Sequence, residues 1–212
     1  MRLMEKIAKQ AGKPTGKFGI LFARSMNKGH IPLTMWGLSH VVINENDVIL
    51  DVGCGGGKTV QTLAIIATEG KIYGIDYSDI SVSVSTSTNK KLITTGQVII
   101  LHASVEYLPF PDNMFDLVTA VETYYFWPDL VNNLKEIKRV LKPEGSLILI
   151  NECYRDDRFE KRNSRWAQMG DFAYHLPEEY KAFLEDAGFS RIHIHIREEK
   201  NWITATGAKR ND

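Results

Sequence analysis

Short apolar runs alternate along the chain with longer segments whose apolar residues recur every three or four positions. Five of the short runs are bounded by polar or glycine residues, and they predict buried strands at residues 48–50, 71–75, 98–101, 115–121 and 147–150. Apolar runs of this length are typical of strands that are covered on both faces of a sheet. The pattern therefore predicts a central sheet flanked by helices.

The segments between these runs predict helices of unequal strength. An apolar stripe over 130–141 predicts the clearest helix, with Pro128 in its first turn, Lys142 in its basic last turn, and Pro143 and Gly145 ending it. Helical spacing also predicts helices near 60–67 and at 177–188. Residues 79–95 are rich in Ser and Thr, so only their place between two strands predicts a helix there.

Two strictly alternating segments, 192–196 and 202–206, predict a closing pair of strands. Repeated strand–helix–strand units predict an α/β fold with a doubly wound, mostly parallel sheet, here of seven strands with an antiparallel C-terminal edge. We expect residues 1–40 to form a short N-terminal helical cap or lid. We expect 41–212 to form the main domain, with 152–176 as an internal lid.

Composition narrows the class of protein. The chain has 212 residues, 43% of them apolar, and 26 basic residues balance 26 acidic ones. This balance gives no support for a nucleic-acid binder. Two cysteines exclude a disulfide framework, and neither a secretory signal nor a membrane-length apolar run is visible. We therefore expect a cytoplasmic protein that acts without nucleic acid or membrane.

A glycine cluster between the first strand and the first helix carries the strongest chemical signal. Residues 51–59 read DVGCGGGKT, which places flexible backbone and unpaired N–H groups where a ligand can approach closely. A P-loop would need glycine where Val52 stands, and the dinucleotide fingerprint would need glycine where Lys58 stands. An acidic residue followed by G-x-G-x-G fits, through Asp51, Gly53, Gly55 and Gly57.

Asp76 helps to separate these alternatives. It lies 19 residues beyond Gly57, at the carboxyl end of the second predicted strand. A carboxylate at this place can accept hydrogen bonds from both ribose hydroxyls of an adenosine. The alternative interpretation is that Asp76 caps the turn that follows.

These residues resemble the class I S-adenosylmethionine-dependent methyltransferases. The resemblance covers roughly residues 48–151 and extends more loosely to the C-terminus. Four segments carry it in the expected order: 48–57, the ribose-binding motif 74–78, the entry to the fourth strand at 108–116, and the turn at 141–147. The resemblance implies S-adenosylmethionine as methyl donor, S-adenosylhomocysteine as product, and a small-molecule acceptor.

The resemblance also implies roles for individual residues. In the glycine loop, Gly53, Gly55 and Gly57 would pack against the methionine and ribose parts of the cofactor. Cys54 would be a small spacer, and Asp51 would order that end of the loop.

The resemblance implies further roles for residues that follow the second, third and fourth predicted strands. Asp76 would hold the ribose diol within the motif that ends at Ser78, and Tyr77 would lie against the adenine. Ser104 and Val105 would meet the adenine edge, although family members often carry Asp where Ser104 stands. Glu122 would lie near the methionine end of the cofactor or the methyl group, and it is the last of the implied cofactor-binding residues.

The catalytic group is less clearly marked, because methyl transfer depends mainly on alignment, and a general base helps only where the acceptor carries a proton. Candidate bases are His30, Tyr124 and Tyr125. The aromatic stretch 122–127 suits either a substrate wall or core packing, and Trp166 is a candidate contact in the internal lid. His193 and His195 share one strand face and fit a surface pair better than a metal site.

Basic and acidic residues are unevenly distributed along the chain. The first 40 residues contain seven basic residues and one acidic residue, which favours an anionic acceptor if this segment covers the site. Lys58 and Thr59 favour a second class, a dehydrogenase or an atypical P-loop NTPase. A non-catalytic module that keeps the fold is the third possibility.

Overall fold

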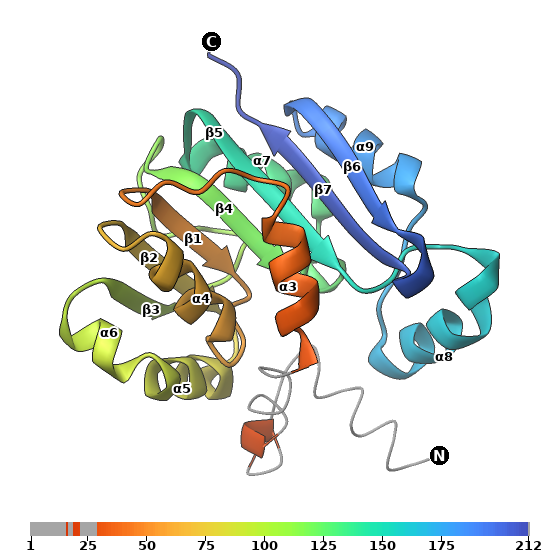
Figure 1. Ribbon diagram of the computed structural model, residues 1–212. Helices are drawn as coiled ribbons and strands as arrows, with labels where there is room; N and C mark the ends of the chain where they lie inside the picture. The colour runs from red at the N-terminus through yellow and green to blue at the C-terminus, as the bar shows by residue number, and fades with distance from the viewer. Residues whose placement is uncertain (1–15, 17–18, 22–28, 212) are drawn as a thin grey trace.

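A computed structural model describes residue 16, residues 19–21 and residues 29–211 of the chain. Its described residues form one seven-stranded sheet in the order β3-β2-β1-β4-β5-β7-β6 (Figure 1). The strands are β1 (Val48–Val52), β2 (Lys71–Asp76), β3 (Val98–His102), β4 (Phe115–Val121), β5 (Leu141–Asn151), β6 (Ser190–Arg197) and β7 (Trp202–Ala208). The predicted doubly wound α/β fold is confirmed.

Helices cover both faces of this sheet (Figure 1). The front face carries α3 (Ile31–Leu38) and α4 (Lys58–Ile66), and α5 (Asp79–Thr88) and α6 (Lys90–Thr94) pack beside β2 and β3. Behind the sheet lie α7 (Leu130–Val140) and α9 (Pro177–Asp186), while α8 (Glu160–Gly170) lies near the end of β5. Residues 29–211 also contain three short 3₁₀ helices: η1 (Tyr124–Phe126), η2 (Asp157–Phe159) and η3 (Glu198–Lys200).

Two apolar cores explain the continuous apolar strands. In β1, Ile49 packs in the core shared with α3 and α4, whereas Leu50 packs in the core shared with α7 and α9. Successive residues of a strand point to opposite faces, so a strand covered twice must be apolar at both kinds of position. Leu134 and Ile137 of α7 are fully buried, as its apolar stripe predicts.

The C-terminal pair of strands is antiparallel, as predicted. β7 pairs antiparallel with β5 on one side and with β6 on the other, so β6 forms the outer edge. The N-terminal part of the predicted cap falls largely outside the described residues. The helix α3, which is described, packs directly on the sheet. The approach is so close that a side chain at Gly37 would collide with Ile150. No helix in the described part of the chain is long and apolar enough to cross a lipid bilayer.

The helix predicted at 79–95 is divided in two. Asn89 is buried between α5 and α6, and its Nδ2 donates to the carbonyls of Gly57 at 2.9 Å and Ser85 at 3.0 Å. A side chain that bonds to nearby backbone competes with continued helix. The division therefore ties α5 to the glycine loop.

The predicted helix end at Lys142 is wrong by two residues. α7 ends at Val140, and β5 begins at Leu141 with a register shift opposite β4. Lys142 instead donates to Asp116 of β4, with Nζ–Oδ2 at 2.7 Å. The turn residues 143–145 form an irregular first part of the strand rather than a loop, with Glu144 at a φ of 65°.

A buried carboxyl group joins the two central strands. Asp51 of β1 is the register partner of Thr119 in β4, whose hydroxyl donates to Asp51 Oδ1 at 2.6 Å. Asp51 is only 2% exposed. Burial raises its pKa to about 7; the Thr119 hydrogen bond opposes this shift and the nearby Asp76 charge reinforces it.

Replacing Asn89 by Ala should destabilise the protein. The change leaves the buried Gly57 carbonyl without its side-chain donor, and we expect a loss of about 1–3 kcal/mol in the free energy of unfolding. Urea denaturation measures this value. Asn211→Ala, at an exposed position, is the matched control, and equal stability of the two variants would contradict the role of Asn89.

Replacing Asp51 by Asn should alter the pH dependence of stability. The pKa of Asp51 is higher in the folded protein than the ordinary value of about 3.9, so proton binding stabilises the fold below pH 4 and this contribution is lost as pH rises through 7. Between pH 4 and pH 7, the free energy of unfolding of the wild type should fall by roughly 2–4 kcal/mol relative to that of Asp51→Asn. Urea denaturation at several pH values measures the difference, and parallel profiles would contradict it.

Candidate functional site

The glycine loop after β1 folds back over the end of β2. The N–H groups of Gly53 and Cys54 both donate to the Ile75 carbonyl, at 2.9 and 2.8 Å. The Gly55 N–H donates to Asp76 Oδ2 at 2.9 Å. Gly53 has a φ of 72°, and a Cβ there would collide with the Thr123 hydroxyl, so this position requires glycine.

Asp76 fixes the turn after β2 as well as the loop. Its Oδ1 accepts from the Ser78 N–H at 2.9 Å, so the predicted alternative of a turn cap is present in the structure. Asp76 is 7% exposed, and burial raises its pKa against the opposing effect of the Ser78 and Gly55 N–H groups. Ser78 itself caps α5, because its hydroxyl accepts from the Ser81 N–H at 3.4 Å.

A pocket of about 260 Å³ opens beside Asp76. Five of the predicted cofactor residues line it, together with the aromatic residues that follow β4. These lining residues are Gly53, Asp76, Tyr77, Ser104, Val105, Phe126 and Trp127. The Ser104 hydroxyl donates to Glu106 Oε2 at 3.1 Å and accepts from the Glu106 N–H at 3.2 Å. The pocket thus joins the ends of β1, β2 and β3 with one wall from η1.

Asp51, Cys54, Gly55 and Gly57, four further predicted residues, do not line this pocket. Asp51 and Cys54 are buried, and Cys54 Sγ lies 3.6 Å from the Ser85 hydroxyl. Gly55 holds the loop to Asp76. Gly57 has a φ of 82° at the N-terminus of α4, and a side chain there would collide with Ser85 and Asn89. The glycine at 57 is therefore required by packing against α5.

Lys58 does not face the pocket. Its Nζ donates to Gln61 Oε1 at 2.6 Å, one turn further along α4. A P-loop lysine must instead reach the phosphates of its ligand. The structure consequently gives no support to the P-loop alternative that Lys58 and Thr59 left open.

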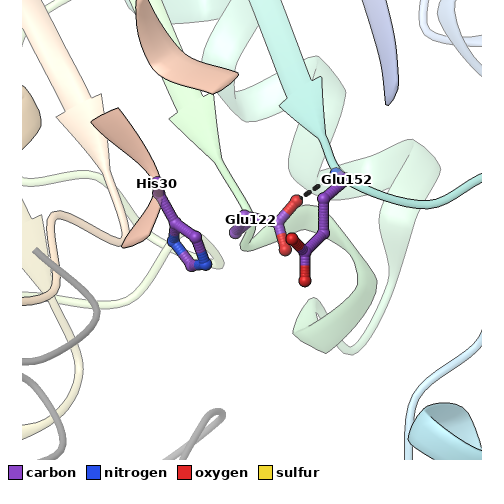
Figure 2. Close-up of side chains that lie close together, drawn as sticks. All are labelled: His30, Glu122 and Glu152. Carbon is purple, nitrogen blue, oxygen red and sulfur yellow. Dashed lines mark hydrogen bonds between the residues drawn. The ribbon is translucent and has the colours of Figure 1, made fainter. Parts of the chain in front are cut away.

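Three side chains meet at the carboxyl ends of β4 and β5. Glu122, Glu152 and His30 place one ligand atom each within 4.8 Å of one another (Figure 2). Glu122 accepts from the Glu152 N–H through Oε1 and from the Tyr125 hydroxyl through Oε2, the latter at 2.6 Å. Burial, reinforced by the charge of Glu152, raises the pKa of Glu122 to about 8.

His30 occupies the N-cap position of α3, but its side chain makes no capping hydrogen bond. Burial lowers its pKa, and the charge of Glu152 opposes that effect. The sequence pattern indicated His30 and Glu122 as separate candidates and gave no indication of Glu152. The place of Glu152 in the chain could have indicated it. Glu152 follows β5 as Glu122 follows β4, and neighbouring parallel strands end at the same edge of a sheet.

The two tyrosine candidates have different surroundings. Tyr124 is 1% exposed, and its hydroxyl donates to the Tyr180 hydroxyl at 2.7 Å beside His175 Nδ1 at 3.1 Å. Burial raises its pKa well above the ordinary value. Tyr125 donates to Glu122 and stacks on Phe172, with ring centroids 4.7 Å apart. Tyr125 therefore belongs to the carboxylate cluster, whereas Tyr124 belongs to the core.

The segment predicted as an internal lid is mostly helical, and it contains five basic and five acidic residues. Beside α8 lies a second pocket, of about 380 Å³, lined by Arg158, Phe159, Lys161, Arg162, Arg165, Trp166 and Met169. Trp166 is 44% exposed. Phe172, just after α8, also contacts Phe126 of the first pocket, at 5.8 Å between ring centroids. The segment is thus attached to the wall of that pocket.

His193 and His195 lie on the outer strand β6. Their ring centroids are 6.4 Å apart, and His195 stacks on His40 at 3.9 Å. No acidic or cysteine side chain joins them as a potential metal ligand in the described part of the chain. The pair therefore lies apart from the pocket and the carboxylate cluster.

Comparisons with known proteins agree with this geometry. The methyltransferase domain family matches residues 50–149. The chain is 31% identical to the sterol 24-C-methyltransferase erg6 of Aspergillus fumigatus over 158 residues, which cover 71% of this chain and 42% of that protein. It is 29% identical to the demethylmenaquinone methyltransferase of Bacillus licheniformis over 169 residues, 69% of this chain and 72% of the relative.

A solved structure shows the same fold. The S-adenosylmethionine-dependent methyltransferase from Aquifex aeolicus superposes with a TM-score of 0.74 and 23% identity, over 91% of this chain and 100% of that one. The sheet order, the glycine loop and the matched domain agree with each other. The chain belongs to the class I S-adenosylmethionine-dependent methyltransferases.

Proposed function

We propose that this protein transfers a methyl group from S-adenosylmethionine to a small-molecule acceptor at the carboxyl edge of its sheet. One observation carries the proposal: a single pocket gathers Gly53, Asp76 and Ser104 from the ends of three parallel strands. Ligands of open α/β sheets bind at this edge. A sterol and demethylmenaquinone, named for two relatives, are acceptors of the same broad class.

The pocket residues suit the adenosine part of the cofactor. Asp76 accepts the Gly55 and Ser78 N–H groups and a hydrogen bond from the Ser81 side chain, and its carboxylate retains acceptor capacity for a ribose hydroxyl. Tyr77 is 42% exposed beside Asp76, so its ring is available to the adenine. Ser104 takes the place of the family's Asp and presents a hydroxyl, while Val105 presents its backbone to the adenine edge.

In this proposal, the methyl-bearing end of the cofactor lies on the side of the glycine loop that is opposite to the adenosine part. Thr123 packs against Gly53, and Glu122 precedes it, so the carboxylate cluster lies beside the methionine end of the pocket. When bound, the cofactor supplies an activated methyl group. The residues of this chain align the acceptor and exclude water. With a pKa of about 8, Glu122 can hold or release a proton near neutral pH.

The acceptor is further proposed to carry an anionic group. Lys161, Arg162 and Arg165 gather along α8, on the segment that Phe172 attaches to the pocket wall, whereas Arg158 at its entry is ion-paired with Asp156 and Glu198. Lys161 and Trp166 are exposed on this surface. A cationic surface with an aromatic side chain favours an anionic organic molecule over a neutral one.

Asp76→Ala should weaken the binding of S-adenosylhomocysteine. Loss of the charged hydrogen bonds to ribose costs roughly 1.5–3 kcal/mol, about a tenfold to 150-fold change in Kd. Isothermal titration calorimetry measures this change, with circular dichroism as a check on folding. The control is Asp79→Ala, an exposed carboxylate outside the pocket. Equal affinities would show that the ribose is held elsewhere, and a folded wild type that binds no S-adenosylhomocysteine would overturn the proposed function.

Lys161→Glu should raise the KM of an anionic acceptor several-fold and leave the Kd of S-adenosylhomocysteine unchanged. Charge reversal at the α8 surface replaces attraction by repulsion, and added salt should raise the wild-type KM for the same reason. A panel of anionic and neutral acceptors, followed by S-adenosylhomocysteine release, provides the measurement. Lys135→Glu on the exposed face of α7 is the control. A salt-independent KM for every acceptor that is turned over would contradict the anionic acceptor.

A further inference from the structure

We propose that His30, Glu122 and Glu152 bind a divalent transition-metal cation at the edge of the cofactor pocket. The cation would hold an oxygen-bearing group of the acceptor, a part of the inference that rests on the proposed function. The binding of the metal itself is independent of it. The three residues come from the start of α3, the end of β4 and the end of β5 (Figure 2).

The spacing of the donor atoms suits one ion. One atom from each side chain lies within 4.8 Å of the other two. His30 nevertheless forms no ion pair within 4.0 Å with either carboxylate. Bonds of about 2.0–2.2 Å from a shared cation place two donors at most about 4.4 Å apart. A small rotation of the side chains therefore completes the site.

The negative charge of this cluster has no ion-pair partner in the described part of the chain. Neither Glu122 nor Glu152 lies within 4.0 Å of a described basic side chain, and no described group donates to the Glu152 carboxylate. The nearby Arg162 donates to Asn201 Oδ1 at 2.8 Å and to Asn163 Oδ1 at 3.0 Å. Two adjacent carboxylates repel each other, and a cation between them would remove that cost.

Surrounding hydrogen bonds orient one ligand and leave the others free to adjust. Tyr125 and the Glu152 N–H hold Glu122 from opposite oxygens. Outer partners of this kind fix the direction of metal-binding carboxylates. The imidazole of His30 is not used for helix capping, and the Glu152 side chain is exposed. The cluster can thus close around an ion without disturbing a helix end.

The donor set selects the class of metal. One imidazole nitrogen and two carboxylates suit Mn²⁺, Fe²⁺ or Zn²⁺ better than Ca²⁺, which takes six to eight oxygen ligands. Three protein ligands leave coordination positions open, as in catalytic metal sites. Because Thr123 links Glu122 to the loop at Gly53, an acceptor oxygen bound there would face the methionine end of the pocket. Metal binding also lowers the pKa of a coordinated hydroxyl group.

Direct metal binding provides the test. Wild-type full-length protein, freed of metal with a chelator, is titrated with Mn²⁺, and free Mn²⁺ is followed by electron paramagnetic resonance, with Zn²⁺ competition as a second readout. We expect one site per chain. His30→Ala and Glu152→Gln should each weaken binding by roughly tenfold or more, because a ligand is lost. Melting temperatures identify any variant that fails to fold.

The controls separate this site from other histidines and carboxylates. His193→Gln changes the surface histidine pair, and Glu45→Gln changes an exposed carboxylate before β1; both should bind Mn²⁺ like the wild type. The proposal is overturned if the wild type binds neither Mn²⁺ nor Zn²⁺, if both ligand variants bind normally, or if His193→Gln abolishes binding.

A separate titration keeps the two proposals distinguishable. S-adenosylhomocysteine is titrated into the wild type both with Mn²⁺ and after chelation, so that cofactor binding and metal binding are measured independently. Failure of the wild type to bind S-adenosylhomocysteine would overturn the proposed function but not the metal site. Normal S-adenosylhomocysteine binding without any metal binding would overturn the metal site alone.

Discussion

The site depends on one backbone contact, the attachment of the glycine loop to the end of β2. The Ile75 carbonyl accepts two N–H groups of the loop, and Asp76 accepts a third. These bonds bend the chain sharply after β1, which is why Gly53 must adopt a positive φ and lie against Thr123. Asp76 is thereby placed at the pocket with its backbone partners already satisfied. A buried carboxylate that is hydrogen-bonded in this way is held in position before any ligand arrives.

Parallel pairing carries that local order across the sheet. Because β1, β2, β3, β4 and β5 run in the same direction, the residues that follow each of them meet at one edge. Asp76, Ser104, Glu122 and Glu152 are far apart in sequence and share this edge for that reason alone. The inserted antiparallel β7 supports β5 from its other side, so the strand that precedes Glu152 is held on both edges.

The strands and the glycine loop could be predicted from the sequence, because each depends on residues that are close together in the chain. Apolar runs located the strands, and the glycine loop with Asp76 located the pocket, since strand burial and tight turns restrict residue type position by position. The break at Asn89 was missed because it depends on a hydrogen bond to Gly57, a contact across 32 residues. Lys142 was misplaced because its partner Asp116 lies on another strand. The meeting of His30 with Glu152 was likewise invisible, since only folding brings α3 to β5.

The zero net charge of the chain hides a local separation of charge at this edge. The half-buried Glu122 and the exposed Glu152 bring two carboxylates together at this edge, while α8 presents basic side chains nearby. If Arg162 neutralised the carboxylates directly, the edge would be a closed ion-pair network with little capacity for ligands. Its guanidinium is instead hydrogen-bonded to the side chains of Asn163 and Asn201 and to the Glu152 carbonyl. The acidic cluster and the basic side chains of α8 therefore meet at one edge without an ion pair between Arg162 and either carboxylate, and the proposed cation and anionic acceptor would each offset the charge of the other there.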